Sequence, residues 1–152
     1  MVFPNVRPIA LCIVRNGSKF LVEYYEWPTP KDRFYRPLGG EIEYGESGKD
    51  AIKREFREEI FAEIKDVQYL GTIENIFKVQ GQIGHELVLL YDADFVDRTF
   101  YSKDVIEGVD GLESKRKVLA YWKTLEDIEE EGLPLYPDRL EEFLEEIGWW
   151  NR

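Results

Sequence analysis

Three glutamates stand at helical spacing within Gly39–Ala62, GGEIEYGESGKDAIKREFREEIFA. Ser47 can cap the amino end of a helix there, and no proline interrupts the residues that follow. With about 3.6 residues per turn, Glu55, Glu58 and Glu59 project from one helix face. Like charges at this spacing repel one another. The pattern therefore predicts a cation at this face, and Mg²⁺, which prefers carboxylate and phosphate oxygens, suits the donors.

A simpler interpretation of the same glutamates is a solvated acidic face on a surface helix of an acidic protein. Ile52, Phe56 and Ile60 recur four residues apart and form an apolar stripe for packing beside that face. Both interpretations require the same helix. The glycines before the helix and Arg54 within it distinguish them.

The segment resembles the Nudix box, which reads G, five residues, E, seven residues, RE, a bulky apolar residue, one residue, EE, one residue, G and an apolar residue. Seven positions match in register: Gly40, Glu46, Arg54, Glu55, Phe56, Glu58 and Glu59. The closing glycine is Phe61 here, and the closing bulky apolar residue is Ala62. Because phenylalanine is strained in the left-handed cap that glycine supplies, we expect the helix to run on by a residue or two or to end differently.

The resemblance implies a role for each matching side chain. A divalent metal, Mg²⁺ or alternatively Mn²⁺, would be bound by Glu55, Glu58, Glu59 and an additional acidic residue from a neighbouring strand. Arg54 would orient the glutamates by ion pairing, and Glu46 would support the site. The additional ligand is expected to be Glu86, with Glu74 as the alternative. The general base differs between branches of the family, so Glu58, Glu59 and Glu86 all remain candidates.

Composition excludes several classes of partner. The chain has 152 residues, which suits a single domain over residues 1–152, and its formal net charge is -11. Such acidity opposes binding to polymeric nucleic acid and favours a small nucleotide that binds with metal. Cys12 is the only cysteine, so no disulfide within the chain is expected. The amino-terminal apolar run is too short and interrupted to cross a membrane, and we expect a cytoplasmic protein.

A segment rich in basic and aromatic residues, WPTPKDRFYRPL, precedes the box. Arginine can fork onto phosphate oxygens and aromatic rings can stack on a nucleobase. Arg36 and Tyr35, with Gly39 and Gly40, are therefore the expected substrate-binding residues. The alternative is a solvent-screened loop that balances nearby glutamates.

The remaining chain predicts strands and two further helices. His85, the only histidine, lacks the partners of a triad and is expected to be an ordinary hydrogen-bonding residue. Trp149 and Trp150 suit either the edge of the core or a subunit contact in a homodimer. The expected elements are strands over Val6–Arg15, Ser18–Glu26, Asp66–Val79, His85–Phe95 and Lys117–Trp122, a hairpin turn at Asn16-Gly17, a loop over Asp97–Glu113 that could cover the site, a helix from Thr124 to Glu131 and a last helix starting at Pro137.

This element order predicts an α+β domain, which the resemblance sharpens to the Nudix α/β/α sandwich with a mixed sheet between helices. The activity implied is metal-dependent hydrolysis of a phosphoanhydride in a nucleoside diphosphate-linked substrate. The proline that follows the box in typical ADP-ribose hydrolases and the SQPWPxS array of NADH hydrolases are absent. The expected substrate is therefore a nucleoside triphosphate or a modified nucleotide, with a nucleotide sugar or a dinucleoside polyphosphate as the alternative. A non-catalytic nucleotide-binding or regulatory module is the rival function.

Overall fold

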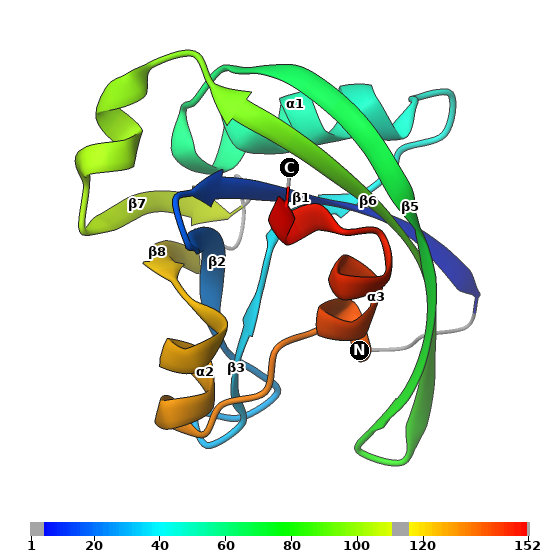
Figure 1. The fold of residues 1–152 in the computed structure, drawn as a ribbon. Helices are drawn as coiled ribbons and strands as arrows, with labels where there is room; N and C mark the ends of the chain where they lie inside the picture. The colour runs from blue at the N-terminus through cyan, green and yellow to red at the C-terminus, as the bar shows by residue number, and fades with distance from the viewer. Residues whose placement is uncertain (1–4, 111–115, 152) are drawn as a thin grey trace.

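The computed structural model describes residues 5–110 and 116–151, which form a sheet with one longer helix against one face and shorter helices against the other (Figure 1). The strands are β1 (Val6–Asn16), β2 (Lys19–Glu26), β3 (Arg33–Arg36), β4 (Leu38–Glu41), β5 (Ile64–Val79), β6 (Gln82–Phe95), β7 (Val105–Asp110) and β8 (Arg116–Lys123). The helices are α1 (Gly48–Ile60), α2 (Leu125–Glu131) and α3 (Leu140–Glu146), with 3₁₀ turns η1 (Arg98–Ser102) and η2 (Trp149–Asn151).

The sheet is mixed, in the order β5-β6-β1-β2-β8-β7, with β4 paired to β1 and β3 paired to β2. Strands β1 and β6 run parallel, whereas the other described pairs are antiparallel. The hairpin predicted at Asn16-Gly17 is present, but its turn lies one residue later: Asn16 pairs with Lys19, and Gly17, with a φ of 65°, and Ser18 form the loop. Strand β1 lies in the middle and carries the box glycines of β4 on one edge.

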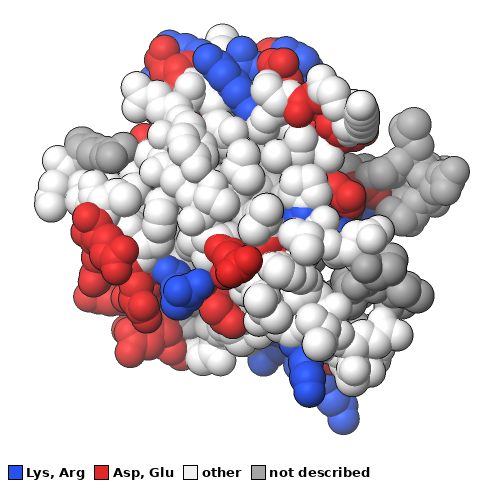
Figure 2. Space-filling model, turned by 90° about the vertical axis from the view of Figure 1, so that its right-hand side faces the viewer, with Lys and Arg blue, Asp and Glu red and all other residues white. Residues whose placement is uncertain are grey.

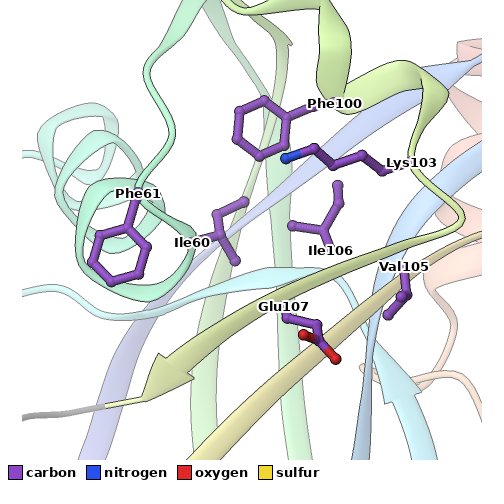
Figure 3. A pocket seen from close by; sticks show the side chains of 7 residues that line it. All are labelled: Ile60, Phe61, Phe100, Lys103, Val105, Ile106 and Glu107. Carbon is purple, nitrogen blue, oxygen red and sulfur yellow. The ribbon is translucent and has the colours of Figure 1, made fainter.

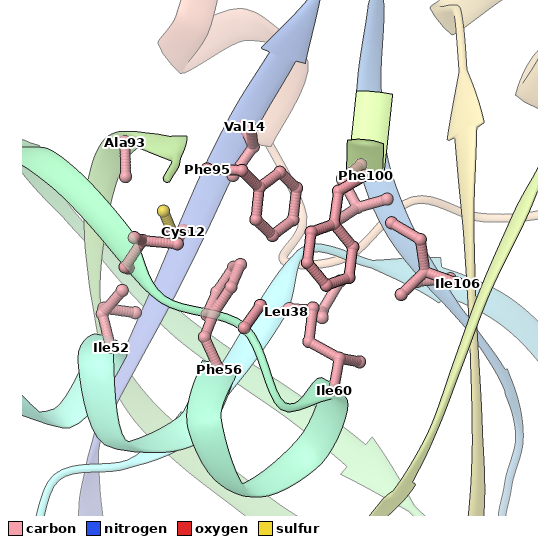
Figure 4. Close-up of a cluster of buried hydrophobic side chains, with 14 of the residues drawn as sticks. Cys12, Val14, Leu38, Ile52, Phe56, Ile60, Ala93, Phe95, Phe100 and Ile106 are labelled. Carbon is pink, nitrogen blue, oxygen red and sulfur yellow. The ribbon is translucent and has the colours of Figure 1, made fainter. Parts of the chain in front are cut away.

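Two hydrophobic cores cover the two faces of this sheet, because side chains alternate along β1. Ala10, Cys12 and Val14 join the core that packs against α1 (Figure 4). Ile9, Leu11 and Ile13 join the core that is closed by α2, α3 and η2. The predicted sandwich, with a mixed sheet between helices, is confirmed.

The stripe predicted for the box helix is also confirmed, since Ile52, Phe56 and Ile60 are all buried against the sheet. At the carboxyl end of the chain, Trp149 is buried, with 1% of its surface exposed, and belongs to the core. Its ring packs edge-on against Phe20, and Arg15 lies over it.

Two expectations about the second half of the chain are wrong. The predicted loop over Asp97–Glu113 contains η1 and strand β7, which pairs with β8, while residues 111–113 lie outside the described residues. The sequence of β7 alternates apolar and polar residues over too few positions to predict a strand. The last helix starts at Leu140 rather than Pro137, since Arg139 has a left-handed φ of 69°.

Candidate active site

Helix α1 begins at the predicted cap residue. Its carboxyl end has the left-handed cap that was not expected of phenylalanine. The Ser47 side chain accepts a hydrogen bond from the Asp50 amide at 3.1 Å. At the other end the helix stops at Ile60, and Phe61 adopts the left-handed conformation, with φ 57° and ψ 37°. The Phe61 and Ala62 amides donate to the carbonyls of Arg57 and Phe56, which closes the last turn. The expected extension is therefore wrong: phenylalanine takes the conformation of the glycine it replaces, with its ring 76% exposed.

Arg54 gathers the carboxylates around the amino half of the box. Its Nε and Nη2 donate to both Glu46 oxygens at 2.8 and 3.0 Å, and its Nη1 donates to Glu55 at 3.0 Å and Glu58 at 3.3 Å. The hydrogen bond from Arg54 lowers the pKa of Glu46, although partial burial opposes the shift. Arg54 thus lies where an orienting residue is expected, with Glu46 as its anchor.

The two glycines of β4 permit two different close approaches. A β-carbon on Gly39, where φ is 150°, would lie 2.0 Å from the carbonyl oxygen of Ala10 in β1. A β-carbon on Gly40 would lie 2.5 Å from Oε1 of Glu55. Gly39 therefore allows the strand pairing, and Gly40 leaves the space that the Glu55 carboxylate occupies.

Glu55 and Glu59 form the chemically unusual pair of the site. Glu59 is only 4% exposed, and burial, a hydrogen bond with Glu55 and the charges of Glu23, Glu55 and Asp110 raise its pKa to about 11. Its Oε2 is buried without a hydrogen-bond partner among the described residues. A buried carboxyl group with an unused oxygen, next to a second carboxylate, is a suitable donor set for a divalent cation.

Glu58 lies apart from this pair. Its side chain is 59% exposed and faces Arg54. Across residues 5–110 and 116–151, no three acidic, thiol or imidazole groups are already gathered as a metal cage. The residues present fit a divalent ion through Glu55 and Glu59, with Glu58 able to join by rotation of an exposed side chain.

The acidic residues proposed from the neighbouring strand lie on β6 and β5. Glu86 pairs across β1 and β6 with Arg7, whose Nη1 is 3.8 Å from its carboxylate, and it is half-buried. Glu74 is exposed and lies 3.1 Å from His85, so these two form a surface pair, as expected for the histidine. Glu86 is among the charges that raise the pKa of Arg36.

Arg36 and Tyr35 point away from each other along β3. Tyr35 is buried in the core of the α2 and α3 face, where its hydroxyl donates to Glu131 at 2.8 Å. Arg36 lies on the α1 side, donates to the Tyr25 hydroxyl at 2.8 Å, and has a buried Nε without a partner among the described residues. Burial opposes its charge, but Tyr25, Glu23, Glu59 and Glu86 raise its pKa. The structure thus brings Arg36 to the carboxylates and leaves Tyr35 in the core.

A buried polar cluster that the sequence did not reveal lies beside Glu59. Glu23 of β2 is completely buried and pairs with Arg116 of β8, which also contacts Asp110. Burial raises the pKa of Glu23, although the charges of Arg36 and Arg116 oppose the shift. The guanidinium groups of Arg36 and Arg116 lie 5.0 and 4.6 Å from the Tyr25 ring centre. The charged residue in the middle of β2 is the only signal in the sequence that points to this cluster.

A hollow of the described surface lies elsewhere, at the carboxyl end of α1 (Figure 3). It has a volume of about 570 Å³ and is lined by Ile60, Phe61, Phe100, Lys103, Val105, Ile106 and Glu107. The Lys103 ammonium lies 4.3 Å from the Phe100 ring centre. Its lining includes neither Glu55 nor Glu59, so the chemistry of the site must be judged from the carboxylates and not from the size of a pocket.

Comparison with known proteins agrees with the geometry of the box. The model of the NUDIX domain family matches residues 5–146. The chain therefore belongs to the Nudix hydrolase family. It is similar to the NAD-capped RNA hydrolase NudC of Mycobacterium tuberculosis (strain ATCC 25177 / H37Ra), at 38% identity over 115 residues, which is 70% of this chain and 36% of the relative. The NudC of Pseudomonas putida KT2440 is 34% identical over 70 residues, which is 46% of this chain and 25% of the relative.

The chain thus spans about a third or less of the length of these curated relatives. Among solved structures, a MutT NUDIX hydrolase from Burkholderia pseudomallei has a TM-score of 0.64 at 19% identity and covers 93% of this chain and 97% of its own. A NUDIX hydrolase from Nitrosomonas europaea has a TM-score of 0.67 at 15% identity, with coverages of 97% and 92%. These structures share the fold. Among the described residues, no helix is long and apolar enough to cross a membrane.

Proposed function

We propose that this protein is a divalent-metal-dependent nucleotide pyrophosphohydrolase that acts as one domain over residues 1–152. The observation that carries the proposal is the pairing of Glu55 with buried Glu59, whose Oε2 lacks a hydrogen-bond partner among the described residues and whose pKa is raised. The Arg54 contacts keep the neighbouring carboxylates of the box in place around this pair. A phosphoanhydride in a nucleoside diphosphate-linked substrate would be cleaved by water.

Glu55, Glu58 and Glu59 would hold Mg²⁺ or Mn²⁺, with Glu86 as a further ligand, and the ion would supply neutralisation of phosphate oxygens and a lowered pKa of the attacking water. Arg54 keeps Glu55 oriented, and Gly40 leaves space for that carboxylate. Arg36 supplies a guanidinium close enough to respond to the charge of Glu59, and it can donate to phosphate oxygens. Among the carboxylates, Glu58, Glu59 and Glu86 are the candidates for accepting the proton of the water.

The first substrate that we propose is a nucleoside triphosphate or a modified nucleotide, which would give a monophosphate and pyrophosphate. The absence of the two sequence signatures described above supports this choice. Tyr35 is not part of this proposal, because its ring is buried in the core. Arg36 remains the proposed contact for the phosphates, and Gly39 and Gly40 shape the floor beneath them.

A second candidate substrate is a dinucleotide of the NAD type, and the named activity of the M. tuberculosis relative favours it. We propose a small dinucleotide rather than capped RNA for this chain. The net charge of -11 opposes a polyanion. On the side of the molecule that carries the β5 and β6 hairpin, lysines and arginines are scattered among acidic residues and neutral surface (Figure 2). This face offers no continuous basic track for a polynucleotide.

The rival function, a nucleotide-binding module without turnover, was suggested by Phe61 and Ala62. Phe61 has the backbone conformation that a glycine would have, and Ala62 is buried with 1% exposure. The substitutions therefore leave the helix end closed and the glutamates upstream in register. This removes the geometric argument for the rival.

A nucleotide panel tests the proposal. The protein is incubated with nucleoside triphosphates, 8-oxo nucleotides, NAD⁺, NADH, ADP-ribose, a dinucleoside polyphosphate and an NAD-capped RNA, with Mg²⁺ or Mn²⁺, and products are resolved by chromatography. Pyrophosphate release supports the first substrate class, whereas AMP with nicotinamide mononucleotide supports the second. Binding of Mn²⁺ without hydrolysis of any compound would replace the enzyme by the binding module.

A further inference from the structure

Arg36 and Glu23 lie directly opposite each other on neighbouring strands, yet they do not form the ion pair that this position favours. Glu23 of β2 is the cross-strand partner of Arg36 in β3. Opposite residues in an antiparallel pair have β-carbons only about 4.5–5.5 Å apart, which is suitable for opposite charges. No carboxylate oxygen of the described residues lies within 4.0 Å of the Arg36 guanidinium nitrogens.

Arg116 instead takes the position beside Glu23. Its Nη2 donates to Glu23 Oε2 at 2.5 Å, across 93 residues of sequence, and to Asp110 at 3.1 Å. Glu23 Oε1 stays buried without a hydrogen-bond partner among the described residues, as does Arg36 Nε. A carboxylate with one unused oxygen therefore stands opposite a guanidinium with one unused donor.

The Arg36 guanidinium is directed elsewhere. It donates to the Tyr25 hydroxyl at 2.8 Å and reaches the carbonyl of Gly39 at 3.5 Å. Tyr25 is itself held by a parallel stack on Phe34, with ring centres 4.9 Å apart and planes 4° apart. The charges of Glu23, Glu59 and Glu86 all stabilise the protonated guanidinium of Arg36. Its approach to the Gly39 carbonyl places it beside Gly40, the residue that faces the Glu55 carboxylate.

We propose that Arg116 is a positioning residue, which pairs with buried Glu23 and so keeps Arg36 directed toward the substrate phosphate beside Glu55 and Glu59. This inference rests on the proposed function for its kinetic consequence. Without Arg116, the carboxylate of Glu23 is left unpaired in the interior. Arg36, which lies opposite Glu23 on the neighbouring strand, then takes the place of Arg116 as its cationic partner. Arg36 would then be withdrawn from the phosphate.

The test is a pair of variants and a matched control. Arg116→Gln is expected to raise KM about 10-fold or more, with little change in kcat. This is the effect expected when one charge-assisted contact to the phosphate is lost. In Glu23→Gln with Arg116→Gln, the carboxylate opposite Arg36 on β2 is gone, so KM is expected to return to within about 2-fold of the wild-type value. Arg98→Gln is the control, because Arg98 also lies over a tyrosine ring, 4.9 Å from the centre of Tyr101, outside this cluster.

The double variant decides the matter even where Arg116→Gln fails to fold, because it leaves no buried carboxylate at position 23 without its arginine partner. A KM that remains at least about 10-fold above wild type in the double variant would show that Arg116 acts directly on substrate or only on the fold. Either result would overturn the inference while leaving hydrolysis itself established.

An activity-independent measurement separates this inference from the proposed function. The Nε–H of Arg36 is buried, so its ¹⁵N–¹H signal is expected to be observable, and Arg36→Lys assigns it. Arg116→Gln should displace this signal, the double variant should restore it, and Arg98→Gln should not move it. If the signal is unchanged in Arg116→Gln, the inference fails, whether or not the wild-type protein hydrolyses a nucleotide.

Discussion

Two arginines lie beside the glutamates of α1 and have opposite surroundings: Arg54 belongs to the helix itself, and Arg36 belongs to strand β3. Arg54 donates to the carboxylates of Glu46, Glu55 and Glu58 and is saturated by them. Arg36 donates to a tyrosine hydroxyl and keeps its charge near carboxylates without pairing to one. A saturated guanidinium fixes the positions of its partners, whereas an unpaired one can still bind an incoming phosphate. Substitution of each arginine should therefore damage a different kinetic parameter.

Replacing each arginine by glutamine is the sharpest test of this comparison. Arg54→Gln releases three carboxylates that repel one another, and kcat is expected to fall about 100-fold, with weaker Mg²⁺ activation. Arg36→Gln is expected to raise KM about 10-fold at an unchanged Mg²⁺ optimum. Steady-state kinetics at several Mg²⁺ concentrations measures both. Equal effects on KM and kcat in the two variants would contradict the division of roles.

The adjacent glycines of β4 separate fold from site. Gly40→Ala places a β-carbon against the movable Glu55 carboxylate, so we expect turnover to fall at least 10-fold with a nearly unchanged melting temperature. Gly39→Ala meets the backbone of β1 and should destabilise the fold by about 2 kcal/mol or more. Thermal unfolding and activity are measured on both. A Gly40→Ala enzyme with wild-type turnover would show that Glu55 does not need its present position.

Phe61 provides a smaller effect that concerns stability alone. Phe61→Gly removes the strain of a left-handed phenylalanine, which is about 1–2 kcal/mol. Because glycine also increases the chain entropy of the unfolded state, the free energy of unfolding is expected to rise by only about 0.5–1 kcal/mol. Urea unfolding measures this change. Phe61→Ala keeps the strain and serves as the control, without a gain. A loss of stability in Phe61→Gly would mean that the exposed ring contributes more than the strain costs.

Glu46 gives the smallest effect, and it depends on pH. Its pKa is lower in the fold than in the unfolded chain, so the stability that it contributes is present above about pH 4.5 and is lost as pH falls through the native pKa. Glu46→Gln should therefore lower the melting temperature near pH 7, and the difference from wild type should shrink steadily as the pH falls below about 4.5. Glu63→Gln, which breaks the exposed Arg57 pair, should change the melting temperature less. A difference that does not shrink below about pH 4.5 would not come from this ionisation.

The contrast between the arginines also explains what could be predicted from the sequence. Arg54 and Glu46 are eight residues apart and belong to one local motif, with Glu46 in the loop before α1 and Arg54 within the helix. Glu23 and Arg116 are 93 residues apart and meet only because β2 pairs with β8. No local periodicity marks that contact, and strand β7, which supplies Asp110, was itself predicted as a loop. The sequence identified Arg36 from its composition, but not the residues that direct it.

Phe61 and Tyr35 show two further limits of local reasoning. Propensity disfavours phenylalanine in a left-handed cap, yet the packing of Ile60 and Ala62 on either side fixes the end of the helix there. Tyr35 and Arg36 are adjacent in a segment of suitable composition, but successive side chains of a strand point to opposite faces. Only one of them could therefore face the carboxylates.

The most direct test of the central claim is the Mg²⁺-dependent turnover of Glu55→Gln beside the wild-type protein, on the best substrate of the panel, with thermal unfolding of both. We predict that turnover falls on the order of 10³-fold, equivalent to about 4 kcal/mol of transition-state stabilisation, while the fold remains intact. Full Mg²⁺-dependent activity in a folded Glu55→Gln protein would contradict the assignment of this glutamate pair as the metal site.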